Sequence, residues 1–267
     1  MCTKWRLPKR LFQGPVYEGV EGPVSEEADE EKISLRMQVF GMFPQKTVLD
    51  LFAGKGYLAW LYAKHGCEKI VCVEKDPKYF SILKQNMAEF GDRVVLILGD
   101  NLRFLDKKLD FEHPVTYVDF DAFGIPTPQI QKFFKNYPIK HGLIISITDS
   151  LIYNFRRMSN VNLRKHYLQD FCLEEDTGKP KSIQDLGEYC IQIQRNFMDI
   201  LCMKYNAQAY PLYFKVNSRF TAVYSSYLIL PKIIGVVDFK RYVGLKDFKL
   251  FSSGKLQKTH LIKQGFG

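Results

Sequence analysis

Apolar residues along this chain gather in short runs, and stretches with helical spacing separate one run from the next. Five such runs predict buried β-strands, at residues 48–52, 69–73, 94–98, 115–118 and 142–147. Four stretches between and before them predict helices, at residues 31–43, 58–65, 78–90 and 129–137. Short apolar runs that alternate with helical patterns indicate βαβ units and a parallel sheet.

The second half of the chain has a different pattern. A long helix is predicted over residues 184–205, and it is followed by two strands at 207–216 and 220–230, with a hairpin at Asn217-Ser218-Arg219. The ends of the chain lack these patterns. We therefore expect an N-terminal arm (1–31), one folded domain (32–231) and a basic C-terminal tail (232–267).

Charge is distributed unevenly. The formal net charge is +9, from 38 basic and 29 acidic residues. Residues 1–150 contain 20 of each sign, so residues 151–267 contain 18 basic and 9 acidic residues. A neutral first half and a basic second half favour an anionic partner such as nucleic acid, although a basic surface that only aids solubility is the other interpretation.

Composition excludes several other classes. No apolar run is long enough to cross a membrane, and the N-terminus lacks the apolar segment of a signal peptide. The six cysteines are scattered without a C-x-x-C pair, which indicates a reduced, cytoplasmic protein rather than a zinc ribbon or a disulfide framework. The five histidines do not cluster either, so no metal site is predicted.

The first predicted strand leads into a glycine-rich turn with the sequence DLFAGKG. Gly54 and Gly56 let the backbone approach a ligand closely, and the helix that follows offers free N–H groups. Glu74 ends the second strand, where a carboxylate can accept hydrogen bonds from both hydroxyls of a ribose. The same pattern occurs in dinucleotide-binding proteins. However, Asp50 at the turn would repel a pyrophosphate and attract a cation, and Asp100 after the third strand could accept from an adenine amino group. Adenine, ribose and a positive charge together describe S-adenosylmethionine.

Over residues 48–230 the motifs DLFAGKG, VEKDP and LGDN, and a strand that ends in acids, resemble the class I S-adenosylmethionine-dependent methyltransferases. This resemblance implies an α/β, Rossmann-like fold with a seven-stranded, mostly parallel sheet, an antiparallel last strand and helices on both faces. It places the cofactor's methionyl part against the glycine turn, its ribose on Glu74, and its adenine at Asp100 and Asn101. Arg36, on the first predicted helix, could reach a bound carboxylate, although an arginine exposed to solvent is the more usual interpretation. The candidate cofactor residues are Asp50, Phe52, Gly54, Gly56, Glu74, Lys75, Asp100, Asn101 and Arg36.

The sequence YVDFDAFGIP at residues 117–126 carries the candidate catalytic residues. Asp119 and Asp121 are two residues apart, so both side chains leave the sheet on the same face. A carboxylate that accepts an N–H hydrogen bond from an exocyclic base amine localises electron density on the nitrogen and can take its proton. Phe123 can stack on a base. These residue types favour methylation of an amine.

VDFDAFGIPTP and GLIISITDSL are similar to motifs of the tRNA guanine N2-methyltransferases that form N2,N2-dimethylguanosine. This resemblance implies that Asp121 contacts the guanine edge, that Phe123 is a stacking wall and that Asp119 is mainly structural or electrostatic. Ala122 stands where that family has proline, which should loosen the turn. The chain ends near Gly267 without zinc-type cysteine spacing, so we expect phosphate contacts from the tail, whose residues from Lys232 on include eight basic and two acidic side chains.

Alternatives remain open at this point. The acceptor could be adenine N6 or another RNA or DNA base, and a nucleic-acid-binding protein that no longer catalyses would have the same fold. A protein-lysine or small-molecule methyltransferase would leave the basic second half without a purpose. Tyr153, Phe155 and Arg156 could line the mouth of the substrate site or pack on the sheet, and Asp149 is a secondary candidate acid.

Overall fold

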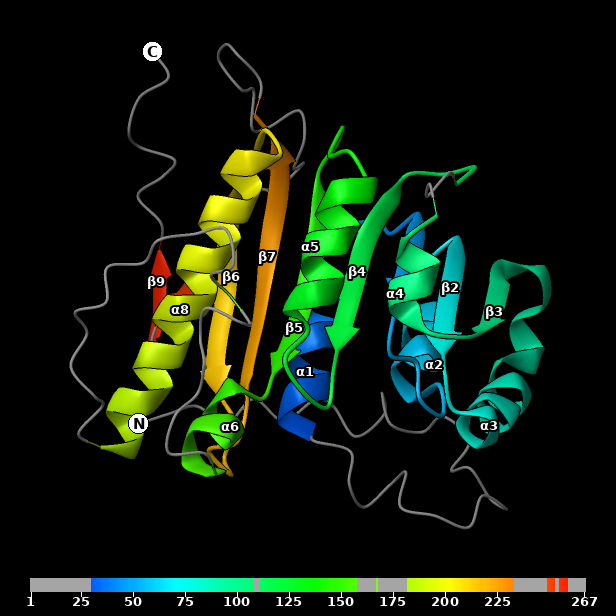
Figure 1. Cartoon of the computed structure of the whole chain (residues 1–267). Coiled ribbons are helices and arrows are strands. Elements are labelled where there is room, and N and C mark those ends of the chain that lie inside the picture. Colours follow the sequence, from blue (N-terminus) through cyan, green and yellow to red (C-terminus); the bar gives the residue numbers. More distant parts are fainter. Residues whose placement is uncertain are drawn as a thin grey trace. The chain divides into compact units, whose positions relative to one another are not determined.

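The computed structural model describes residues 30–107, 111–157, 167 and 182–232, together with the backbone of two short strands at 249–252 and 255–258. Seven strands of the described chain form one sheet in the order β3-β2-β1-β4-β5-β7-β6 (Figure 1). The described chain consists of two compact units, and one boundary between them lies within strand β4 (Val115–Asp121). The first unit comprises the described residues up to 104 with 111–119, and the second comprises 105–107 and the described residues from 120 on.

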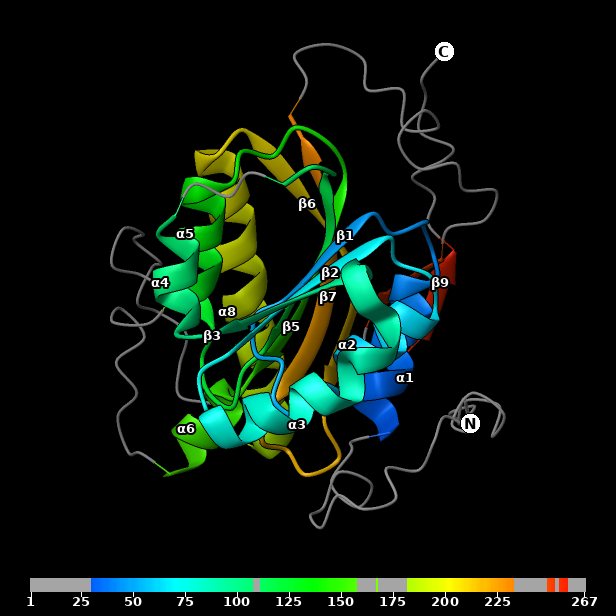
Figure 2. The ribbon, with the colours of Figure 1, turned by 90° about the vertical axis from the view of Figure 1, so that its right-hand side faces the viewer.

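The first unit contains the βαβ repeats that the sequence predicts. Its elements are α1 (Glu30–Phe40), β1 (Thr47–Asp50), α2 (Tyr57–Lys64), β2 (Lys69–Glu74), α3 (Pro77–Met87), the 3₁₀ helix η2 (Ala88–Arg93), β3 (Val94–Leu98) and most of α4 (Asn101–Leu105). Strand β1 pairs in parallel with β2 and with β4, and β2 pairs in parallel with β3. Helices α1, α2 and α3 lie on one face of these strands (Figure 2).

Local sequence explains why these elements begin where they do. Asp76 caps α3 by accepting hydrogen bonds from the backbone N–H groups of Lys78 (2.7 Å) and Tyr79 (3.3 Å), and Pro77 occupies the first helical turn, where its missing N–H costs nothing. All four residues of β1 are buried, as expected for a parallel strand that is covered on both faces.

The second unit contains α5 (Thr127–Asn136), β5 (Leu143–Asp149), α6 (Leu151–Arg157), α8 (Ile183–Lys204), β6 (Ala207–Val216), β7 (Val223–Pro231) and the hairpin strands β8 (Lys249–Ser252) and β9 (Lys255–Lys258). Strand β7 is antiparallel to both β5 and β6. Ser182 caps helix α8, because its hydroxyl accepts from the Asp185 N–H at 3.0 Å. Gly187 lets α8 approach β6, since a Cβ there would lie 2.9 Å from a methyl group of Val216.

The predicted fold is confirmed: the sheet has seven strands, it is mostly parallel, and its last strand in sequence is antiparallel. One element was not predicted, and one local prediction is wrong. Residues 151–157 form helix α6, which the sequence did not indicate, and the final strand begins at Val223 rather than at residue 220. The second difference has a clear cause: the Asn217 side chain accepts from the N–H groups of Thr221 (2.8 Å) and Ala222 (3.1 Å), which keeps 217–222 in a loop.

The predicted N-terminal arm lies outside the described residues except for its end, and only two short strands of the predicted tail are described. The domain boundaries therefore stay a prediction. Within the described ranges, no helix is both long enough and apolar enough to span a membrane.

Candidate functional site

Glu74 organises the glycine-rich turn of the first unit. Its Oε2 accepts from the Gly54 N–H at 2.7 Å, and its Oε1 accepts from the Asp76 N–H at 2.7 Å. The residue is only 9% exposed. Each carboxylate oxygen has further lone pairs, so Glu74 can hold the turn and still accept hydrogen bonds from a ligand. The two motifs that the sequence placed at successive strand ends are thus joined directly.

The two glycines of this turn serve different purposes. Both have left-handed backbone conformations, with φ of 54° at Gly54 and 87° at Gly56. At Gly56 a Cβ would lie 2.5 Å from Cδ1 of Leu83, so any larger residue would force the Leu83 side chain to move. At Gly54 a Cβ would meet nothing nearer than the Phe52 carbonyl at 4.0 Å. The space above Gly54 is therefore open to a ligand.

The remaining candidates of the first unit divide into two groups. Asp50 is buried (2% exposed) and its Oδ1 accepts from the Phe52 N–H at 3.3 Å, while Asn101 donates to the Leu51 carbonyl at 2.9 Å. These bonds fix the end of β1 and the start of α4. Asp100 and Lys75 are exposed. Asp100 accepts from the Arg103 N–H at 3.1 Å.

Arg36 is not an exposed arginine, and that interpretation is wrong. Its side chain and that of Asp119 are both 0% exposed, and its Nε lies 3.0 and 2.9 Å from the two carboxylate oxygens of Asp119. The Tyr62 hydroxyl also donates to Asp119, at 2.5 Å. Buried charges require such partners because desolvation is costly. The contacts support the structural role predicted for Asp119.

The charges around Asp50 favour a cationic ligand. Asp50 and Asp119 are register partners on the adjacent parallel strands β1 and β4. Arg36 compensates the charge of Asp119, so the two carboxylates and one guanidinium have a formal net charge of one negative unit. Burial, and secondarily the charge of Asp119, holds the pKa of Tyr62 well above its usual range, so this hydroxyl remains a proton donor.

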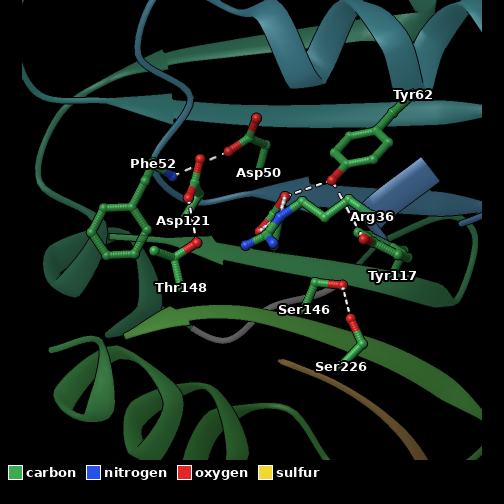
Figure 3. A network of polar contacts seen from close by, with 10 residues as sticks. Arg36, Asp50, Phe52, Tyr62, Tyr117, Asp121, Ser146, Thr148 and Ser226 are labelled. Atoms are coloured by element: carbon green, nitrogen blue, oxygen red, sulfur yellow. Dashed lines mark hydrogen bonds and ion pairs between the residues drawn. The ribbon is translucent and has the colours of Figure 1, made fainter. Parts of the chain in front are cut away.

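The acceptor candidates lie in the second unit at the end of β4. Asp121 is half-buried, and its Oδ1 accepts from the Thr148 hydroxyl at 2.6 Å (Figure 3). Two residues later Phe123 is fully exposed, at 101% of its reference area. The pair Asp121 and Phe123 therefore presents an oriented carboxylate and an uncovered aromatic ring.

Backbone hydrogen bonds hold the turn that carries Phe123. The Ala122 N–H donates to the Phe120 carbonyl at 3.0 Å, a bond that proline could not make. The Ser150 N–H donates to the Gly124 carbonyl at 3.0 Å. These contacts stabilise the turn in the absence of the family proline, so the expected loosening at Ala122 is not supported.

Asp149 belongs to the interior of the second unit. It is 2% exposed, and its carboxylate accepts from the Leu151 N–H (3.0 Å), the Tyr167 hydroxyl and the Gln194 amide (3.4 Å). Burial raises its pKa to about 6 against these hydrogen bonds. Its proposed role as a second acceptor acid is therefore not supported. Sequence reasoning missed Tyr167 and Gln194 as partners of Asp149, because no periodicity relates these positions. The only sequence signal for Thr148 as a site residue was its place beside Asp149 at the end of a strand.

Comparison with known proteins gives a match over part of the chain. Residues 25–119 match the family model of the TRM5/TYW2 methyltransferase domain. In solved structures, Trm1 from Pyrococcus horikoshii in complex with S-adenosyl-L-methionine is similar with a TM-score of 0.55 and 14% identity, over 75% of this chain and 53% of that chain. Part of this chain thus matches a methyltransferase domain, and the chain shares the fold of that Trm1 structure. The match over residues 25–119 bears out the predicted methyltransferase class.

A curated relative gives a narrower but weaker match to this chain. The tRNA (guanine(26)-N(2))-dimethyltransferase of Thermoplasma volcanium is 26% identical over 114 residues, which are 43% of this chain and 31% of that relative. The matched segment thus spans less than a third of the relative's length. Within the described ranges, no cluster of three or more His, Cys, Asp or Glu side chains could hold a metal ion.

Proposed function

We propose that this methyltransferase binds S-adenosylmethionine through its first unit and methylates an exocyclic amine of a nucleic-acid base, with N2 of guanine in tRNA as the first candidate. The observation that carries the proposal is the end of β4, where the oriented carboxylate of Asp121 is followed by the fully exposed ring of Phe123. The name of the Thermoplasma volcanium relative supports the choice of guanine N2 in tRNA.

The residues of the first unit fit the cofactor. Glu74 has lone pairs for a ribose, the backbone of Gly54 borders open space, and the net negative charge at Asp50 suits a cation. We assign Asp100 and Asn101 to the adenine, Asp50, Phe52, Gly54 and Gly56 to the methionyl part, and Lys75 to the rim. Arg36 acts through Asp119 in this scheme. When bound, S-adenosylmethionine supplies an electrophilic methyl group on a positively charged sulfur.

On the acceptor side, Asp121 supplies the base chemistry. The lone pair of an exocyclic amine is delocalised into the ring, which makes the nitrogen a poor nucleophile. A carboxylate oxygen of Asp121 accepts the amine N–H, raises the electron density on nitrogen and takes the proton as the new N–C bond forms. Thr148 fixes the plane of the carboxylate through Oδ1, and Phe123 stacks on the base to hold it in place. The tail from Lys232 on adds phosphate contacts that do not depend on sequence.

The proposal is tested by transfer of a labelled methyl group from S-adenosylmethionine to bulk tRNA, followed by mass analysis of the nucleosides. We expect Asp121→Ala to lower the rate about 10²- to 10⁴-fold, the range for loss of a general base, while calorimetry shows unchanged cofactor affinity. Asp106→Asn is the matched control, since Asp106 is 60% exposed and forms only a surface ion pair with Lys132.

The outcomes separate the alternatives. N2-methylguanosine or N2,N2-dimethylguanosine in the product supports guanine N2, whereas N6-methyladenosine moves the acceptor to adenine. Transfer to no RNA or DNA, together with measurable cofactor binding, would overturn the acceptor proposal. A chain that binds nucleic acid but not S-adenosylmethionine would instead be a binding protein on a methyltransferase fold.

A further inference from the structure

Helix α6 exposes an aromatic ring and a guanidinium side by side. Tyr153 is 43% exposed, and Arg157, one turn later, is also exposed. The Arg157 guanidinium lies 5.8 Å from the centroid of the Tyr153 ring, and its Nη1 donates to the Tyr153 hydroxyl at 2.9 Å. The methyltransferase scheme above does not use this pair.

The backbone that presents this pair is held at two places. The Tyr153 N–H donates to the Thr221 carbonyl at 3.0 Å, and Arg156 donates to the carbonyls of Arg219 (3.2 Å) and Phe220 (3.0 Å). Helix α6 is thereby fastened to the loop between β6 and β7 (Figure 1). A rigid platform of this kind loses little conformational entropy on binding.

The same contacts connect the platform to the acceptor residues of the second unit. Helix α6 starts directly after Ser150, whose N–H holds the Gly124 carbonyl in the turn of Phe123, and Thr148 holds Asp121. Tyr153 and Phe123 are thus both exposed aromatic residues, and the segments that carry them are both held at the end of strand β5. Both belong to the second unit.

The chemistry of the platform fits a polynucleotide. Residues 151–157 and 217–222 contain Arg156, Arg157 and Arg219 and no acidic residue. An aromatic face accepts any base by stacking, and an arginine beside it can contact the adjoining phosphate. The whole positive excess of the chain lies in residues 151–267, which favours an anionic strand over an apolar protein partner.

We propose that Tyr153 and Arg157 form a subsite for an unpaired nucleotide that flanks the methylated base of an RNA substrate. Tyr153 stacks on the base of that nucleotide, and Arg157 contacts its phosphate. The assignment of RNA as the ligand rests on the proposed function. The subsite adds to that function a contact with the nucleotide next to the reacting base.

The test measures RNA binding directly, by fluorescence anisotropy of an unmodified tRNA transcript over a range of salt concentrations, and methyl transfer separately. Tyr153→Ala should weaken binding and raise KM about 5- to 150-fold, the range that corresponds to about 1–3 kcal/mol per stacked base. The value of kcat at saturating RNA should stay within about twofold, because the reacting groups are untouched. Tyr153→Phe keeps the ring and should bind RNA like wild type. Arg157→Ala should reduce the slope of log affinity against log salt by about one.

Arg195→Ala is the matched control, because the exposed Arg195 also lies 5.8 Å from a ring centroid, that of Phe214, but on α8 and β6. Wild-type binding and KM in Tyr153→Ala, or an equal loss in Arg195→Ala and Arg157→Ala, would overturn the subsite while leaving the proposed function intact. Wild-type RNA binding that depends on Tyr153 without methyl transfer would overturn the proposed reaction and uphold the subsite. Absence of RNA binding by the wild-type chain would overturn both.

Discussion

The buried pair of Arg36 and Asp119 makes a quantitative prediction about stability. Both side chains are 0% exposed, and Arg36 Nε is within 3.0 Å of both carboxylate oxygens. Arg36→Met leaves Asp119 charged and buried, with the Tyr62 hydroxyl still donating to it. Removing one partner of a buried ion pair costs about 3–5 kcal/mol, which is a large part of the about 5–15 kcal/mol that stabilises a typical domain.

Two further variants isolate the cause. Arg36→Lys keeps the charge but loses the planar fork, and we expect a loss of about 1–2 kcal/mol. The double variant Arg36→Met with Asp119→Asn removes both charges and keeps an acceptor for Tyr62. It should recover most of the loss, because the penalty comes from the uncompensated carboxylate rather than from the missing contact.

Urea unfolding followed by the fluorescence of Trp60 measures this effect in the first unit, where Trp60 is 7% exposed. The chain has two tryptophans, so Trp5→Phe is introduced throughout to leave Trp60 as the reporter. With a slope of about 3 kcal/mol per molar urea, Arg36→Met should lower the midpoint by about 1–1.7 M. A midpoint within about 0.3 M of the parent, or a double variant less stable than Arg36→Met, would refute the reasoning.

Three other predictions follow from the described contacts. Thr148→Val removes the hydroxyl that donates to Asp121, and kcat should fall about 10-fold or more, since a hydrogen bond to a charged group contributes about 1.5–3 kcal/mol. Thr148→Ser keeps the hydroxyl and should retain the rate, so equal rates in the two variants would contradict the proposed role of Thr148 in orienting Asp121. The pKa of Asp149 is raised to about 6 in the folded protein, so the folded state binds this proton more tightly, and the stabilisation from protonation is lost as pH rises from about 4 through about 6. Asp149→Asn should therefore flatten the pH dependence of unfolding by about 2–3 kcal/mol between pH 4 and 7, and a variant with the wild-type slope would argue against it. Gly56→Ala meets both a φ of 87° and a 2.5 Å approach to Leu83, so it should destabilise the first unit by more than about 1 kcal/mol by urea titration, whereas Gly66→Ala, where φ is 96° but no atom lies within 4 Å, should cost less.

The order of elements could be predicted from the sequence because it depends on local patterns. Strands that are buried on both faces have sequences of short apolar runs. The candidate site residues come soon after such runs, namely Gly54, Gly56, Glu74 and Asp121. In a parallel sheet the ends of successive strands meet at one edge, and the hydrogen bond from the Gly54 N–H to Glu74 is an example of such a meeting.

What the sequence could not decide were contacts between side chains far apart in the chain. Arg36 and Asp119 are 83 residues apart, and Asp149 and Gln194 are 45 apart. No spacing rule connects such positions, since their meeting depends on how helices pack on the sheet. An arginine on a helix is usually exposed, so its burial shows only when the carboxylate opposite is known.

The sequence alone thus determined the α/β class, the order of strands and helices along the chain and the residue types at the strand ends, because propensity and periodicity act over a few residues. The tertiary structure decided which of the acids is available for chemistry. Asp119 and Asp149 are neutralised or enclosed by distant partners, while Asp121 is only half-buried and is oriented by Thr148. The physical reason is desolvation: a carboxylate inside the protein must be paired, and only the folded chain supplies the partners.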